Sequence, residues 1–301
     1  MESRADERGT VRIDPRWLPA LRARGLDSYS ALIGFAGDGP AREKRRRRIA
    51  RVVFSAPPPG GASAAQGTPE TPPAAPAPLL YLKQHLRTPL REALGDLFAG
   101  KAPRSAARRE WEAIAALRRA GLDTMAPVAL GERRRFPWLG GSFIATEGVS
   151  GTRLEDFAAS FRGHFREKRC ILLSLARCAR LMHGAGFTHR DFYLCHLFLR
   201  SDGGLTLIDL QRVTRGGPGH RRRAVKDLAA LNYSAPSPAV PRAARMRFRL
   251  AYLGRRRAGA AGRRLARRIA RKTERIRRHD ANKRARAALA AAGRGPTRAA
   301  P

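Results

Sequence analysis

The sequence has few acidic residues for its length, and this shortage sets its charge. The 301 residues contain 24 Asp and Glu against 61 Lys and Arg, which gives a formal net charge of +37 and a pI near 11.8. A chain of this kind is expected to act close to an acidic or phosphate-bearing partner. Hydrophobic residues still make up 43% of it. The composition therefore excludes a purely disordered basic protein and allows a buried core.

Cysteine is also scarce, and long apolar runs are missing. The three cysteines, Cys170, Cys178 and Cys195, lack metal-ligand spacing, which argues against a disulfide framework or a zinc site. No stretch approaches the roughly 18 to 20 apolar residues of a spanning helix, and the first ten residues lack the apolar core of a secretory signal. We therefore expect packed, reduced thiols and a cytoplasmic protein.

Hydrophobic patterns divide the chain into an ordered series of elements. Two strand-like runs, 49–54 and 79–82, are expected to pair as a hairpin, and the Pro-, Ala- and Gly-rich residues 55–78 between them are interpreted as a flexible insertion. Further along, the patterns predict a helix over 105–120, strands at 126–130 and 142–146, a long helix over 165–185 and a strand at 205–209. This order predicts an α+β fold that resembles a two-lobed kinase.

Two aspartates occur at the positions where kinases carry their catalytic and metal-binding carboxylates. Asp191 ends the string His189-Arg190-Asp191, and Asp209 follows the strand-like LTLI 18 residues later. Phosphoryl transfer needs one carboxylate at the attacking hydroxyl and another at the metal, because its catalysis is mostly positioning and charge neutralisation. The HRD string alone is weak evidence for a kinase, but the long helix before it and the strand before Asp209 strengthen that interpretation. The alternative is that both aspartates are ordinary turn residues.

The stretch LMHGAGFTHRDFYLCHLFLR, together with LTLIDLQR, closely resembles the bacterial lipopolysaccharide core kinases, the heptose/Kdo kinase family also called WaaP- or InaA-like. The resemblance covers about residues 83–280. It implies a protein-kinase-like fold, with a small β-rich N-lobe and a mainly helical C-lobe. It also implies transfer of the ATP γ-phosphate to an inner-core sugar of lipopolysaccharide at the cytoplasmic face of the inner membrane.

The resemblance also implies roles for individual residues. Asp191 would be the catalytic aspartate, within the motif His189-Arg190-Asp191, and Asp209 would hold Mg²⁺. His196 occupies the position where protein kinases carry a metal-binding Asn. Imidazole suits Mg²⁺ less well than oxygen does, so His196 is left as a metal ligand, a hydrogen-bond partner of Asp191 or of a phosphate, or a loop histidine.

Other residues complete the expected nucleotide site. Lys83 is placed at the end of its strand to grip the ATP phosphates, and it is expected to pair with Glu110, which the family resemblance favours over Glu112. Backbone groups of Glu147 and Val149 resemble a hinge that would bind adenine.

Two further features are left open between a functional and an ordinary interpretation. The glycines at 34–39 form either a phosphate-binding loop or a plain turn. Asp227 either braces the HRD backbone or is a first-turn aspartate favoured by the helix dipole.

The last fifth of the chain holds about half of the basic surplus. Residues 241–301 contain 21 Lys and Arg but only Glu274 and Asp280 as acids, and a narrow apolar stripe of helical spacing runs through them: Leu265, Ile269 and Ile276. Docking to an anionic membrane surface or glycolipid is the preferred interpretation. A solvated face is the ordinary alternative. Binding to nucleic acid is the competing function, and it is disfavoured because no recognised binding motif occurs.

We therefore predict an N-lobe at 1–146, a catalytic C-lobe core at 147–240 and a basic helical region at 241–301. The predicted function is an ATP- and Mg²⁺-dependent kinase of a heptose or Kdo hydroxyl, peripheral at the inner face of the plasma membrane. A small-molecule or protein kinase of the same fold is one alternative. A catalytically silent pseudokinase that acts as a basic scaffold on membrane or nucleic acid is the other.

Overall fold

The structure, a computed structural model, describes residues 1–44, 47–55, 78–86, 102–135, 138–160, 165–235, 240–257 and 259–292. Most of the expected insertion, residues 56–77, lies outside these ranges. The chain forms two compact units. Unit 1 comprises Met1–Arg119, Asp123–Ser150 and Asp209–Gln211, and unit 2 comprises Ala120–Leu122, Gly151–Ile208 and Arg212–Pro301.

Unit 1 is built on a seven-stranded antiparallel sheet with the order β1-β2-β6-β7-β5-β4-β3. The strands are β1 (Glu2–Asp6), β2 (Gly9–Ile13), β3 (Arg42–Lys44), β4 (Arg47–Val53), β5 (Leu79–His85), β6 (Pro127–Arg135) and β7 (Trp138–Glu147). The predicted hairpin is confirmed, since β4 pairs with β5 from Val53↔Leu79 to Arg47↔His85. One expectation was wrong: Lys83 does not end its strand, because β5 continues to His85.

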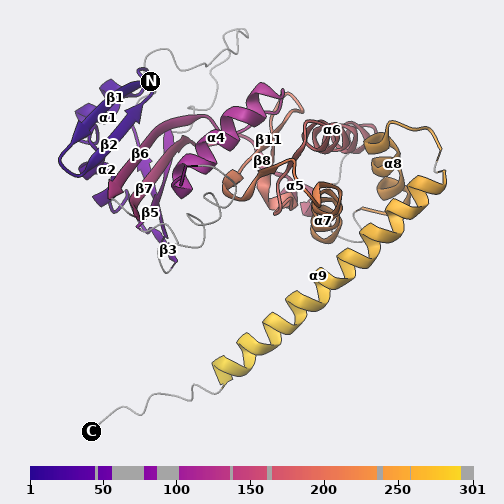
Figure 1. Cartoon of the computed structure of the whole chain (residues 1–301). Coiled ribbons are helices and arrows are strands. Elements are labelled where there is room, and N and C mark those ends of the chain that lie inside the picture. Colours follow the sequence, from indigo (N-terminus) through magenta and orange to yellow (C-terminus); the bar gives the residue numbers. More distant parts are fainter. Residues whose placement is uncertain are drawn as a thin grey trace. The chain divides into compact units, whose positions relative to one another are not determined.

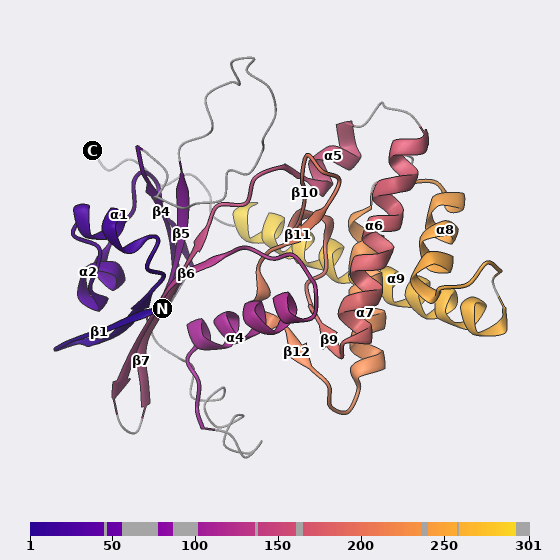
Figure 2. The ribbon, with the colours of Figure 1, turned by 90° about the horizontal axis from the view of Figure 1, so that it is seen from above.

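The alternation of side chains along β5 gives the sheet two different faces. Leu80 and Leu82 join a core formed with α1 (Leu18–Ala23) and α2 (Tyr29–Gly34). Successive side chains of a strand point to opposite faces, so Lys83 and His85 lie on the other face. The helix α4 (Ala106–Arg119) contacts that face, as Figure 2 shows. This helix confirms the predicted one at 105–120.

Unit 2 is mainly helical (Figure 1). Its helices are α5 (Leu154–Ser160), α6 (Phe165–Gly184), α7 (His220–Ser234), α8 (Arg242–Leu253) and α9 (Ala260–Ala292). Between α6 and α7 lie β9 (Phe187–Thr188), η1 (Leu194–His196), β10 (Leu197–Leu199), β11 (Leu205–Leu207), η2 (Leu210–Arg212) and β12 (Thr214–Arg215), and β10 also pairs with β8 (Thr152–Arg153). The predicted long helix is confirmed as α6, and the expected α+β class is confirmed by the β-rich unit 1 and the helical unit 2.

The described part of the basic C-terminal region forms two helices that belong to unit 2. The helix α8 packs on α6, and α9 packs on α7. Ile269 of the predicted apolar stripe is buried, and Thr273 on the same face donates a hydrogen bond to the carbonyl oxygen of Ala229 at 3.3 Å. Asp280 accepts a hydrogen bond from the Tyr233 hydroxyl at 2.8 Å. Among the described residues, no helix has the length and apolar character that crossing a membrane requires.

Candidate active site

Lys83 and Glu110 form a buried ion pair on the α4 face of the sheet. The Lys83 Nζ donates to Glu110 Oε1 at 2.6 Å, and the Glu110 side chain is fully buried. Glu112, the other glutamate on this helix, instead pairs with Arg104 at 3.1 Å and is 44% exposed. The partner expected from the sequence is therefore the one that α4 turns toward Lys83. A buried charge of this kind is costly unless it is paired, so the pair holds the lysine in one place.

Asp209 lies beside the same lysine. Its Oδ1 is 3.7 Å from Lys83 Nζ. The backbone of Asp209 has a φ of 58°, in the left-handed region that residues other than glycine rarely adopt. Such strain persists where the surrounding structure fixes it, and it is common at functional sites. The local geometry thus places a partly exposed carboxylate next to the cation expected to hold phosphates.

His85 also belongs to this face, and the sequence analysis missed it. It follows Lys83 by two residues in β5, so both side chains point the same way. Burial, with smaller effects of the nearby Arg47 and Lys83 charges, lowers the pKa of His85 to about 4. Its Nε2 has no hydrogen-bond partner within the described part of the chain. The imidazole is therefore neutral at physiological pH. The two-residue repeat of a strand, counted from Lys83, is the sequence signal that could have identified His85.

The expected hinge at the end of β7 is partly engaged in the sheet. The amide of Glu147 donates to the carbonyl of Ala126 at 2.9 Å, and its carboxylate accepts from Trp17 Nε1 at 2.8 Å. The amide of Gly148 donates to Leu79 at 2.6 Å. Val149 follows directly and lies outside the strand. The amides of Glu147 and Gly148 are thus already hydrogen-bonded within unit 1.

The glycines at 34–39 lie against the edge of the sheet. Gly37 has a φ of 105°, and a side chain there would meet Ala50 at 3.0 Å. Asp38, whose pKa the Arg24 guanidinium lowers to about 2, accepts a hydrogen bond from the amide of Val53 at 2.8 Å. These contacts pack the segment as a turn on β4, and phosphate binding by its glycines stays a prediction.

The catalytic-loop motif lies in unit 2, and its backbone is held by a buried aspartate. Asp227 accepts hydrogen bonds from the amides of His189 and Arg190, each at 2.7 Å. Arg190 has a φ of 73°, so this left-handed turn is fixed by the two bonds. The bracing role proposed for Asp227 is thus observed. The first-turn alternative was wrong, because α7 begins at His220 and Asp227 is fully buried in its middle.

Two histidines hold further backbone carbonyls at the catalytic loop. His189 Nε2 lies 3.0 Å from the carbonyl oxygen of Ile208, the residue before Asp209. His196 Nδ1 lies 2.7 Å from the carbonyl oxygen of Asp191, and its ring stacks on that of His189. The observed contact of His196 is the hydrogen bond to Asp191, one of the roles left open by the sequence. Among the described residues, no three His, Cys, Asp or Glu side chains group closely enough to hold a metal ion.

The Asp227 network extends outward to the basic region. His183 Nε2 lies 3.3 Å from Asp227 Oδ2, and His183 Nδ1 lies 3.0 Å from the hydroxyl of Tyr252 on α8. Burial raises the pKa of Tyr252 to about 12, so the hydroxyl keeps its proton. The first helix of the basic region thus contributes to the support of the catalytic loop.

Two cations lie at Asp191 that the sequence analysis did not single out. Arg212 Nη1 lies 2.9 Å from both carboxylate oxygens of Asp191. Lys226 Nζ donates to the carbonyl oxygen of Arg190 at 3.0 Å. Arg212 falls three positions after Asp209 in IDLQR, and only the folded chain returns it to the loop. The carboxylate expected to meet the acceptor is therefore set among positive charges.

Comparisons with known proteins identify relatives of the chain. The lipopolysaccharide core heptose(I) kinase WaaP of Pseudomonas aeruginosa is 37% identical over 186 residues, which are 58% of this chain and 69% of that protein. The protein of the same name from Escherichia coli K12 is 35% identical over 185 residues, 58% of this chain and 70% of the relative. A solved structure, described as WaaP in complex with acyl carrier protein, superposes with a TM-score of 0.63 at 29% identity and covers 88% of this chain and 98% of that one.

The superposition shows that the chain has the kinase-like fold of WaaP. The family model of the lipopolysaccharide kinase (Kdo/WaaP) family matches residues 79–252, a segment that begins at β5 and ends on α8. That segment contains Lys83, the HRD motif, Asp209 and the helix that carries Asp227. With more than half of its length matched, the chain belongs to the lipopolysaccharide kinase (Kdo/WaaP) family, whose members are phosphotransferases.

Proposed function

We propose that the chain transfers the γ-phosphate of ATP to a heptose or Kdo hydroxyl of the lipopolysaccharide inner core. One observation carries the proposal more than any other: Asp227 braces the HRD backbone, so that Asp191 is presented from a fixed loop. The relatives named as heptose(I) kinases supply the acceptor class. Phosphoryl transfer depends on positioning, and this is what a braced loop provides.

The nucleotide would be held by residues of unit 1. Lys83, fixed by Glu110, would bind the ATP phosphates, and the carbonyl of Glu147 with the backbone of Val149 would bind adenine. Asp209 fits Mg²⁺, which is commonly held by one or two carboxylates together with phosphate oxygens and waters. Bound there, the metal would neutralise charge on the phosphates. His196 would support Asp191 through its hydrogen bond, and ligation of a second metal by this histidine is the weaker proposal.

Asp191 would act on the acceptor. Its carboxylate would accept a hydrogen bond from the attacking hydroxyl and take up its proton as the oxygen bonds to the γ-phosphorus. The bond between this phosphorus and the bridging oxygen breaks, and ADP leaves. His189 and Arg190 would act through the backbone, since the observed contacts of both residues fix the turn that presents Asp191.

The acceptor is tested with labelled nucleotide. Wild type incubated with γ-labelled ATP, Mg²⁺ and dephosphorylated lipopolysaccharide core is expected to label the core sugar. Asp191→Asn should abolish transfer and keep nucleotide affinity within about twofold, because the side chain meets the acceptor. Asp202→Asn, in an exposed turn, is the matched control and should retain activity. Label on protein alone would favour a protein kinase, and wild type that neither binds nor hydrolyses ATP would leave the pseudokinase alternative.

The nucleotide site has its own matched pair of variants. Glu110→Gln removes the charge that holds Lys83 and should weaken ATP binding by roughly tenfold or more, because a buried charge loses its partner. Glu112→Gln, on the same helix but paired with Arg104, should change affinity less than twofold. Calorimetric titration with a non-hydrolysable ATP analogue and Mg²⁺ measures both. Equal affinities for the two variants would contradict the assigned role of Glu110.

We further propose that α9 docks on an anionic membrane surface. Its outward face carries exposed arginines, while Ile269 and Thr273 face α7. Glu274, one of its two acids, is already paired with Arg277 and Arg278. Each basic residue close to an anionic surface adds about 1 kcal/mol of attraction. A peripheral enzyme held in this way would meet a glycolipid acceptor at the inner face of the plasma membrane.

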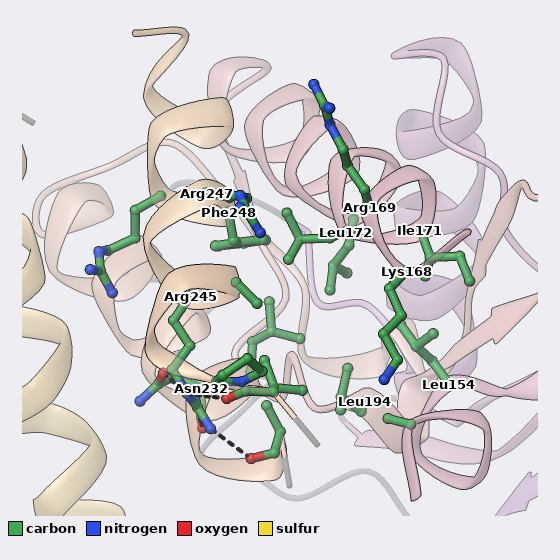
Figure 3. A pocket seen from close by; sticks show the side chains of 18 of the residues that line it. Leu154, Lys168, Arg169, Ile171, Leu172, Leu194, Asn232, Arg245, Arg247 and Phe248 are labelled. Carbon is green, nitrogen blue, oxygen red and sulfur yellow. Dashed lines mark hydrogen bonds between the residues drawn. The ribbon is translucent and has the colours of Figure 1, made fainter. Parts of the chain in front are cut away.

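A second partner is proposed from the solved relative described in complex with acyl carrier protein. Unit 2 contains a cavity of about 320 Å³, drawn in Figure 3. Its apolar side chains come mainly from α5, α6, η1, α7, α8 and α9, and Lys168, Arg169 and Arg247 also line it. The apolar ones labelled in the figure are Leu154, Ile171, Leu172, Leu194 and Phe248. We propose that this protein binds an acyl carrier protein. The apolar cavity would hold the acyl group that the carrier protein bears.

The cavity offers a matched test on one helix. Ala244 of α8 lines it, whereas the neighbouring Ala243 lines a second groove that α8 forms with α9. Ala244→Trp should weaken binding of purified acyl-loaded carrier protein at least tenfold, while Ala243→Trp should leave it unchanged. Carrier protein without an acyl chain should bind wild type more weakly than the loaded form. Equal binding of the loaded and unloaded forms would exclude the cavity as the acyl site.

A further inference from the structure

The carboxylate of Asp191 has one hydrogen-bonding side chain among the described residues, and it is Arg212. A single nitrogen, Nη1, lies 2.9 Å from each carboxylate oxygen. Arg212 ends η2, and its side chain is 46% exposed, against 21% for Asp191. Exposed ion pairs contribute little to stability. The position of the pair on the catalytic loop therefore suggests a use other than holding the fold together.

The rest of the loop is fixed through its backbone and not through this carboxylate. Asp227 holds the amides before Asp191, His196 holds the carbonyl of Asp191, and Lys226 holds the carbonyl of Arg190. None of these contacts determines the rotation of the Asp191 carboxylate about its own side-chain bonds. Arg212 does constrain it, because Nη1 lies 2.9 Å from both oxygens and so fixes the direction in which the carboxylate points.

The contact also leaves the carboxylate able to accept another proton donor. Each ionised oxygen has two acceptor positions, and Arg212 uses one on each. A hydroxyl approaching from the other side can still bind. The guanidinium stays charged at all working pH values and has no acceptor groups, so it cannot compete for the proton that leaves the hydroxyl.

We propose that Arg212 is a positioning residue for phosphoryl transfer, which orients the Asp191 carboxylate and keeps a positive charge beside the acceptor hydroxyl. The inference rests on the proposed function, since it assigns Asp191 to the acceptor. Arg212 acts through Asp191 and would leave nucleotide binding, which is assigned to residues of unit 1, unchanged. Lys226, whose hydrogen bond goes to the carbonyl of Arg190, would not replace it.

The experiment compares Arg212→Gln, Arg212→Lys and Arg212→Ala with Arg221→Gln, an exposed arginine at the start of α7. Transfer to the core sugar, affinity for the ATP analogue and the melting temperature are measured for each. Arg212→Gln should lower kcat about 10- to 100-fold, with nucleotide affinity within twofold and an unchanged melting temperature. Arg212→Lys should recover most of the loss, and added methylguanidinium should partly restore Arg212→Ala. Arg221→Gln should match wild type.

A structural role would give a different result. Wild-type kcat in Arg212→Gln would overturn the proposal, as would parallel losses of kcat, nucleotide affinity and melting temperature. A loss of kcat that neither lysine nor methylguanidinium recovers would also overturn it. If wild type labels no sugar, the proposed acceptor fails, and Arg212 is then tested on hydrolysis of ATP, where water takes the place of the hydroxyl at Asp191. Unchanged hydrolysis in Arg212→Gln would reject the role of Arg212.

Discussion

At the scale of single residues, the α4 face of the sheet combines one charged pair with one neutral imidazole. Lys83 pairs with Glu110 at 2.6 Å, whereas His85 two positions on is buried near Lys83 and Arg47 and has a pKa of about 4. A buried cation without an acid costs free energy. The strand thus presents one cation, not two, to the proposed phosphate site. His85 can contribute hydrogen bonding there without adding charge.

This pKa predicts how stability depends on pH. A histidine titrates near 6.5 in the unfolded chain, so between pH 6.5 and 4 the unfolded state binds more protons than the folded one. The free energy of unfolding therefore falls as pH drops through this window, and the contribution is fully present above it. Its total is about 3 kcal/mol at most. Urea unfolding of wild type and His85→Gln at pH 7, 5.5 and 4 measures it.

The glutamine variant should lose much of this acid-dependent decrease, although it starts from a lower stability at pH 7. His279→Gln, an exposed histidine of α9, is the control and should keep the wild-type pH dependence. If His85→Gln and wild type lose stability in parallel between pH 7 and 4, then His85 is not the group that titrates.

At the scale of elements, the catalytic loop is supported by a helix outside the motif. The Tyr252 hydroxyl of α8 contacts His183, which in turn contacts Asp227. Tyr252→Phe removes that hydroxyl and leaves the buried Nδ1 of His183 unpaired. The cost should be roughly 1 to 3 kcal/mol in the free energy of unfolding. Hydrogen exchange should show faster opening at the amides of His189 and Arg190, both of which donate to Asp227.

Tyr81→Phe is the control for this variant, because Tyr81 is 38% exposed on β5. It should change neither the stability nor the exchange of the loop amides. Exchange rates at His189 and Arg190 that match wild type in the Tyr252 variant would show that α8 does not support the loop. Exchange that rises throughout unit 2 would indicate a general loss of packing.

The sequence predicted the elements whose patterns are long and apolar. The pairing of β4 with β5 and the helices α4 and α6 follow from such patterns, and Glu110 could be chosen because the resemblance fixed its helix. The hairpin of β1 and β2 was missed because ESRAD and GTVRI are short and mostly polar, so they give little periodic signal. Polar residues are expected on an edge strand such as β1, because they disfavour pairing of its free edge with another chain.

The site residues that were missed depend on tertiary structure. Arg212 reaches Asp191 across 21 positions of the sequence, and no local pattern reports this approach. The first-turn alternative for Asp227 set this residue one helix turn or more too close to the start of α7, because the arginines at 221–223 carry no apolar periodicity that would mark the helix before it. Motifs identified the aspartates, but their supporting contacts required the fold.

At the scale of the whole molecule, the net charge of +37 has two parts. Some basic residues are spread over the chain, and others are concentrated on α9. Burial lowers the pKa values of Arg245 and Arg249 on α8, so these two arginines are partly withdrawn from solvent. The arginines on the outward face of α9 are more accessible than these two. If α9 is the docking surface, the location of the arginines should matter more than their number.

That difference can be measured with two variants of equal net charge. The first replaces four exposed arginines of α9 by glutamine: Arg264, Arg268, Arg271 and Arg275. The second replaces four exposed arginines of unit 1: Arg8, Arg12, Arg118 and Arg119. Sedimentation with vesicles containing about one-third anionic lipid should show a loss of binding of roughly 100-fold or more for the first, since each cation near the surface adds about 1 kcal/mol.

The second variant should lose much less, because those arginines do not line the proposed docking face. Raising the salt concentration should weaken wild type steeply and the α9 variant little, since screening acts on charges that contribute to binding. Kinase activity on a soluble core fragment should be unchanged in the α9 variant, which keeps every residue assigned to the site. Equal losses in the two variants would instead assign membrane binding to total charge, and α9 would then be a solvated helix.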